Sequence, residues 1–139
     1  MTQQVLLLPA FAMVALTIAV YLRMYAMRIG QMKRERIHPQ SVATSAQANA
    51  RLTDSRAADN LRNLFELPVL FYLALLVAAV TGVATTTTLA LAWSFVALRV
   101  AHSVIQCGYN KVMHRFKVHF TGFVVLCALW IQLAFVSYR

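Results

Sequence analysis

Three long uncharged stretches restrict what this chain can fold into. They cover residues 5–22, 67–98 and 120–138. A helix needs roughly 20 apolar residues to cross a bilayer. The first and third stretches each fit one crossing, and the middle one fits most of two, with a turn in the segment TGVATTTT. The pattern therefore predicts an all-α, integral membrane four-helix bundle.

The predicted spans cover residues 5–26, 58–82, 87–107 and 115–137, within a single transmembrane domain over residues 1–139. A polar loop over residues 28–57 joins the first two spans. No Lys or Arg precedes the first apolar stretch, so the positive region that starts a signal peptide is missing and we expect a retained span. The composition agrees, because 12% of the residues are charged, against about 25% in an ordinary soluble domain.

The net charge of +9 is distributed unevenly along the chain. Basic residues gather between spans one and two and between spans three and four, whereas the N-terminus and the link between spans two and three have none. By the positive-inside rule, both basic loops are expected in the cytoplasm and both termini on the other side, in a bacterial inner membrane. Orientation and attraction to anionic lipid explain this charge, so we expect membrane lipid as a partner and no nucleic acid.

Spans two, three and four each carry a polar stripe near the basic loops, at 100° per residue. The stripe residues are Asp59, Arg62, Asn63 and Glu66 in span two, Arg99, His102, Ser103 and Gln106 in span three, and Arg115 and His119 in span four. Such groups are costly facing lipid, so they should face one another or a wet cleft. Glu66 and Arg99 are the expected buried ion pair, since an unpaired charge at that depth would cost several kcal/mol.

Two other interpretations of the stripes stay open. A purely structural network would fix helix register or oligomeric state without any ligand. A metal or haem site would use His102, His114 and His119, but the last two are five residues apart and align poorly on a helix. No CxxC or HExxH pattern accompanies them, and the expectation is no metal. The two cysteines likewise do not suggest a disulfide framework.

Several motifs together resemble those of the MAPEG family, the membrane-associated proteins in eicosanoid and glutathione metabolism. The segment RNLFELPVLFY resembles the R-N-x-x-E signature of the family's second helix, through Arg62, Asn63 and Glu66. The segment RVAH resembles the third-helix motif, and Arg115 enters the fourth span as family members do. The chain resembles a short bacterial-type member over its whole length.

The resemblance implies a homotrimer that binds glutathione between subunits near the cytoplasmic side. It implies that Arg115 is catalytic, because a nearby cation raises the thiolate fraction of a thiol. The residues implied to bind glutathione are Arg62, Asn63, Glu66, His102, Tyr109 and His119. Four positions depart from the pattern. Gln106 and His119 stand where family enzymes have tyrosines, Phe116 stands where one has a serine, and Pro68 follows the glutamate sooner than in the family.

Three functions follow as alternatives. The first is a glutathione-dependent transferase, peroxidase or isomerase that acts on a lipophilic electrophile or hydroperoxide. The second is a non-catalytic membrane protein whose stripes hold a trimer together or bind lipid. The third is a small transporter, which would be expected to carry an acid near the bilayer midplane, whereas the acids here lie near the basic loops.

Overall fold

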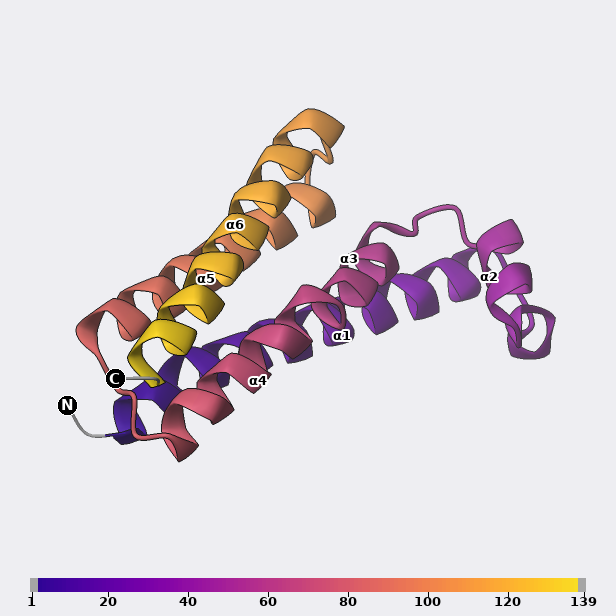
Figure 1. The fold of residues 1–139 in the computed structure, drawn as a ribbon. Helices are drawn as coiled ribbons and strands as arrows, with labels where there is room; N and C mark the ends of the chain where they lie inside the picture. The colour runs from indigo at the N-terminus through magenta and orange to yellow at the C-terminus, as the bar shows by residue number, and fades with distance from the viewer. Residues whose placement is uncertain (1–2, 138–139) are drawn as a thin grey trace.

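The computed structural model describes residues 3–137, and all of its regular elements are helices (Figure 1). The long elements are α1 (Leu7–Arg34), α4 (Leu67–Val80), α5 (Thr86–Cys107) and α6 (Val112–Ser137). The shorter ones are the 3₁₀ helices η1 (Gln3–Leu6) and η2 (Pro39–Val42), and the helices α2 (Ser45–Arg51) and α3 (Arg56–Leu64).

Within the described residues, four helical segments are long and apolar enough to cross a membrane. They cover Gln4–Arg34, Arg56–Val80, Thr86–Cys107 and Val112–Ser137. The predicted all-α membrane fold with four spans is confirmed. Helices α5 and α6 form a hairpin (Figure 1), in which α5 contacts α1 and α3 and α6 contacts α4.

The second span is divided into two helices. Helix α3 ends at Leu64, and α4 begins at Leu67 with Pro68 in its first turn. Proline cannot donate to the carbonyl four residues earlier, and its ring clashes with that carbonyl, so a continuous helix is disfavoured here. The chain instead makes tight turns, with Phe65 N donating to Arg62 O at 3.0 Å. Glu66 therefore lies between the two helices, immediately before α4.

Helix α1 continues well past the predicted end of its span at residue 26. Its 28 residues make a helix of roughly 42 Å at 1.5 Å per residue, longer than the hydrocarbon core of about 30 Å. The last turns of α1 therefore reach beyond the core, and α2 lies near their end (Figure 1). Buried Gln31 joins this arm to the following segment by donating to Thr53 Oγ1 at 3.1 Å.

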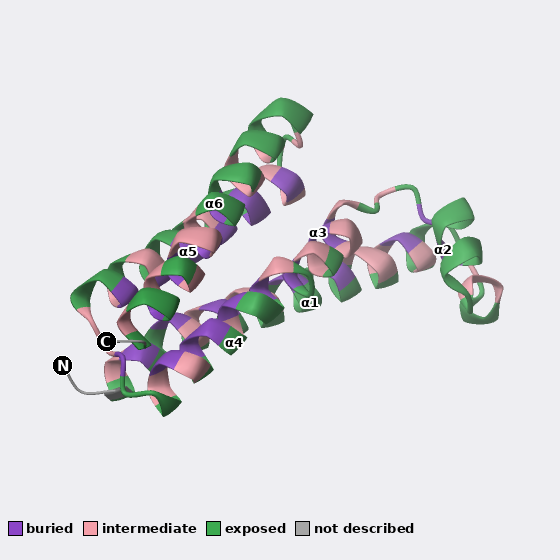
Figure 2. Ribbon diagram, viewed as in Figure 1, coloured by how far each residue is buried: buried purple, intermediate pink, exposed green. Residues whose placement is uncertain are grey.

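The apolar core lies between the four spans. Buried and exposed residues lie on different faces of the helices (Figure 2), and many of the exposed residues are large and apolar. Phe71 of α4 and Phe95 of α5 stack at its centre, with ring centroids 4.7 Å apart. Helix α5 is the most enclosed span, because 39% of the residues in its apolar stretch are buried, against 22% of those in the corresponding stretches of α1 and α6. Residues of α5 therefore face neighbours on several sides.

A buried arginine joins α5 to α6. Arg99 is 1% exposed, and its guanidinium donates to the backbone oxygen of His119 at 3.3 Å and contacts His119 Nδ1 at 3.4 Å. The guanidinium also lies over the Phe95 ring, 5.2 Å from its centroid. A Cβ atom added to Gly122 would lie 2.9 Å from Arg99 Nη2. The absence of a side chain at Gly122 makes room for the arginine.

Replacing Gly122 with alanine should therefore destabilise the hairpin. The new methyl group displaces the Arg99 guanidinium from His119, and overpacking of this kind costs about 1–3 kcal/mol. The free energy of unfolding, measured by titration with sodium dodecyl sulfate and followed by circular dichroism, should fall by that amount.

Gly30→Ala is the matched control, because a Cβ atom at Gly30 would meet nothing within 4 Å. Alanine favours a helix over glycine by roughly 0.5–1 kcal/mol, so this variant should be as stable as the wild type or more so. Equal stability of the two alanine variants would contradict the close packing at Gly122.

Candidate functional site

A cavity of about 230 Å³ lies where α3, α5 and α6 meet, near the basic-loop end of the bundle. Its lining residues are Asn63, His102, Val112, Arg115, Phe116 and His119. Asn63 comes from α3, His102 from α5 and the others from α6. The cavity thus gathers side chains from three of the predicted polar stripes.

The polar face of α5 fixes the α3 side of this cavity. Asn63 Nδ2 donates to Gln106 Oε1 at 3.0 Å. One turn away on each helix, Ser103 Oγ donates to Asn60 Oδ1 at 3.3 Å, and Asn60 is fully buried. Interhelical hydrogen bonds between side chains stabilise membrane helices by roughly 1 kcal/mol each. These bonds hold Asn63 against α5 at the cavity wall.

Two arginines stabilise the end of α5. Arg23 Nη2 donates to Cys107 O at 3.1 Å, and Arg56 Nη1 donates to Gly108 O at 2.6 Å. Cations at a helix C-terminus interact favourably with the helix dipole and the last carbonyls. Arg56 also bridges Asp54 at 2.7 Å, and this hydrogen-bonded guanidinium holds the pKa of Asp54 below its usual value. The turn after α5 is therefore anchored to both α1 and α3.

The α6 side of the cavity is positioned by contacts with α5 and with the turn. The rings of His102 and His119 meet edge to face, with centroids 5.3 Å apart. Because an Arg99 N–H points at His119 Nδ1, the neutral tautomer that accepts this contact carries its proton on Nε2. Arg115 Nη1 donates to Asn110 Oδ1 at 2.9 Å. Asn110 has φ of 50°, a left-handed conformation that asparagine tolerates better than most residues.

The cavity is electropositive in its lining, and Glu66, which lies outside the lining, is an acid close enough to interact electrostatically with Arg99 and His119. Half-buried Arg115 lines it, Arg99 lies behind His119, and none of the lining residues is acidic. Arg99 Nε is buried without a hydrogen-bond partner among the described residues. Cations in a poorly hydrated cleft raise the local concentration of anions. The arrangement suits a ligand with a carboxylate or a thiolate.

Three predicted site residues lie outside this cavity. Arg62 and Glu66 are exposed, and so is Tyr109, whose hydroxyl lies 3.1 Å from His114 Nδ1. Across residues 3–137, the ion pair between Asp54 and Arg56 is the only one within 4.0 Å. Glu66 and Arg99 are therefore not paired in the described part of the chain. Glu66 lies between α3 and α4, whereas the predicted stripe placed it on one continuous helix.

The sequence reasoning missed Val112, Phe116 and the buried position of Asn60. Val112 and Phe116 line the cavity although both are largely exposed apolar residues. Their hydropathy is the same as that of lipid-facing residues, so it carried no signal. Asn60 lies one turn before Asn63, a spacing that placed both amides on the α5 side. In the described part of the chain, no three His, Cys, Asp or Glu residues gather closely enough to hold a metal ion.

A comparison with known families gives this arrangement a context. The model of the MAPEG family matches residues 6–135, nearly the whole chain. No curated protein and no solved structure matches this chain. The match includes nearly all of the four membrane helices and every residue that lines the cavity. The chain therefore belongs to the MAPEG family.

Proposed function

We propose that this protein is a glutathione-dependent membrane enzyme, a transferase, peroxidase or isomerase acting on a lipophilic electrophile or hydroperoxide. The electropositive cavity carries the proposal, because it brings Asn63, His102, Arg115 and His119 together from three helices. Family membership supports a role related to glutathione or eicosanoids in a membrane.

The residues present fit the chemistry of glutathione, which has two carboxylates, one ammonium and one thiol. Arginine suits carboxylates, since its guanidinium forms two parallel hydrogen bonds to them. Asn63 pairs with amide groups, and exposed Glu66 beside the cavity accepts from the ammonium. Arg62, also exposed, adds a second cation at the same end of α3.

The size of the cavity favours a site completed by a second protomer. Its volume of about 230 Å³ lies below the roughly 300–1,000 Å³ that is usual for small-molecule sites. Assembly as a homotrimer, as MAPEG members often show, would place a neighbouring surface over the open side. Arg62 and Glu66 would then act from the rim of a shared site.

Glutathione would supply the thiol that reacts. Arg115 stabilises the thiolate, lowering a thiol pKa that is otherwise about 8.5. The Nε2–H of His119 is the donor left for the ligand once Nδ1 has been taken by Arg99. Val112 and Phe116 give the mouth an apolar edge through which a lipophilic substrate arrives from the bilayer.

The protein is an integral multi-pass membrane protein, and we propose the orientation that its charges favour. The basic loops would lie in the cytoplasm and both termini on the other side, in a bacterial inner membrane. The cavity is at the basic-loop end, so it would open near the cytoplasmic surface, where glutathione is available.

A non-catalytic role is the second candidate, and one observation favours it. Asn63 and His119 already use hydrogen-bonding groups within the chain, on Gln106 and Arg99. The same contacts would be expected of side chains that only hold helices together.

Replacing Arg115 with alanine should remove most of the thiolate formed from bound glutathione. If the contact with Arg115 lowers the thiol pKa by one unit, it contributes about 1.4 kcal/mol. Its loss then lowers the thiolate fraction about tenfold at any pH below the pKa of the thiol. The ultraviolet absorbance of the thiolate, read on the detergent-purified protein at neutral pH, measures it directly.

Lys117→Ala is the matched control, because Lys117 is an exposed cation on the same helix that does not line the cavity. This variant should keep the wild-type thiolate signal. A wild-type signal in Arg115→Ala would remove Arg115 from the proposed role. No signal in the wild type at saturating glutathione would favour the non-catalytic candidate.

A further inference from the structure

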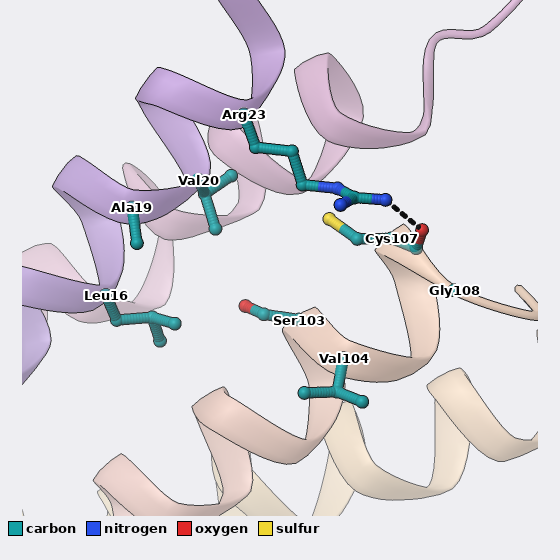
Figure 3. Close-up of a pocket in the computed structure, with 8 residues that line it drawn as sticks. All are labelled: Leu16, Ala19, Val20, Arg23, Ser103, Val104, Cys107 and Gly108. Atoms are coloured by element: carbon teal, nitrogen blue, oxygen red, sulfur yellow. Dashed lines mark hydrogen bonds between the residues drawn. The ribbon is translucent and has the colours of Figure 1, made fainter. Parts of the chain in front are cut away.

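A second cavity, of about 370 Å³, lies between α1 and α5 (Figure 3). Leu16, Ala19, Val20 and Arg23 line it from α1, and Ser103, Val104, Cys107 and Gly108 line it from α5 and the turn after it. It shares no lining residue with the cavity that contains Arg115. The proposed glutathione chemistry makes no use of it.

This cavity is apolar at one end and cationic at the other. Leu16 and Val104 lie at the apolar end, and the Arg23 side chain reaches across the other end toward the Cys107 carbonyl (Figure 3). Seven residues separate Leu16 from Arg23, which is roughly 10 Å along a helix. The cavity is therefore complementary to an amphiphile with a negatively charged head and an apolar chain.

Arg23 retains the capacity to bind an anion. A guanidinium has five N–H donors, and in residues 3–137 the Arg23 side chain makes one hydrogen bond, to Cys107 O at 3.1 Å. In the neighbouring Arg56, by contrast, all three guanidinium nitrogens already donate hydrogen bonds. Nε and Nη2 donate to Asp54 at 2.9 and 2.7 Å, and Nη1 donates to Gly108 O. Of the two arginines that hold this turn, Arg23 is the one that lines the cavity.

The position of Arg23 along α1 matches the level of lipid headgroups. The apolar helical segment begins at Gln4, so Arg23 lies roughly 28 Å along it at 1.5 Å per residue. The hydrocarbon core of a bilayer is about 30 Å thick. An anionic head on Arg23 would thus sit at the interface while its chain remains in hydrocarbon.

We propose that this α1–α5 cavity binds an anionic amphiphile, with a carboxylate or phosphate on Arg23 and the start of the acyl chain along Leu16, Val20 and Val104. A free fatty acid and an anionic phospholipid share this chemistry. Because the cavity borders α5 on the side away from the Arg115 cavity, its ligand would hold α1 against α5 without occupying the glutathione site.

Cys107 lines the cavity, so the reactivity of its thiol can report whether a ligand occupies the cavity. The chain has two cysteines, so the full-length Cys127→Ala variant leaves Cys107 as the single thiol. Its rate of labelling by N-ethylmaleimide is measured in detergent with oleate, with dioleoylphosphatidylglycerol, or with neutral oleyl alcohol. An occupant at about ten times its Kd should slow labelling about tenfold.

Protection by oleate alone would identify a fatty acid as the ligand, and protection by the phospholipid alone an anionic phospholipid. Protection by both supports the shared chemistry. Protection by oleyl alcohol as strong as that by oleate would overturn the proposal, because Arg23 would then contribute nothing. No protection by any of the three would overturn it as well.

Variants in the same Cys127→Ala background test the cationic end. Arg23→Gln should abolish protection by the anionic probe, whereas Arg28→Gln should retain it, because Arg28 lies on the same helix but does not line the cavity. Ala19→Phe, which fills the cavity and leaves Arg23 in place, keeps the proposal testable if Arg23→Gln fails to fold. Full protection in Ala19→Phe would contradict binding in this cavity.

Discussion

The burial of one arginine constrains much of this structure. Arg99 is almost fully enclosed, and no carboxylate lies within 4.0 Å of it in the described part of the chain. A charge in that position must be offset by its surroundings. The bundle supplies the His119 carbonyl and ring, the face of Phe95, and the space left by Gly122. These contacts fix how α5 packs on α6, and they leave positive potential behind the cavity wall.

Helix α5 consequently organises both cavities. One of its faces carries His102 toward the cavity that contains Arg115, and another carries Val104 and Cys107 toward α1. Ser103 and Gln106 of α5 form hydrogen bonds with Asn60 and Asn63 of α3. A single rigid helix thus has a cationic pocket on each of two sides, one suited to a small anionic thiol and the other to an amphiphile.

The membrane fold was predictable because long uncharged stretches have few other stable environments. The gathering of Asn63, His102, Arg115 and His119 followed from their common end of the bundle and from helical spacing. The placement of Glu66 did not follow, because angular periodicity assumes an unbroken helix and Pro68 interrupts it. Tyr109 lies in the turn after α5, where helical spacing has no meaning. The cavity between α1 and α5 depends on the inclination of two helices, which no local pattern in the sequence encodes.

The central claim is that the electropositive cavity binds glutathione, and calorimetric titration of the detergent-purified wild-type protein with glutathione tests it most directly. We predict saturable binding of glutathione. S-methylglutathione should bind more weakly, because it keeps both carboxylates and the ammonium but cannot form the thiolate that Arg115 stabilises. Absence of any binding heat up to millimolar glutathione would contradict the claim, and the polar stripes would then be read as contacts that hold the helices together.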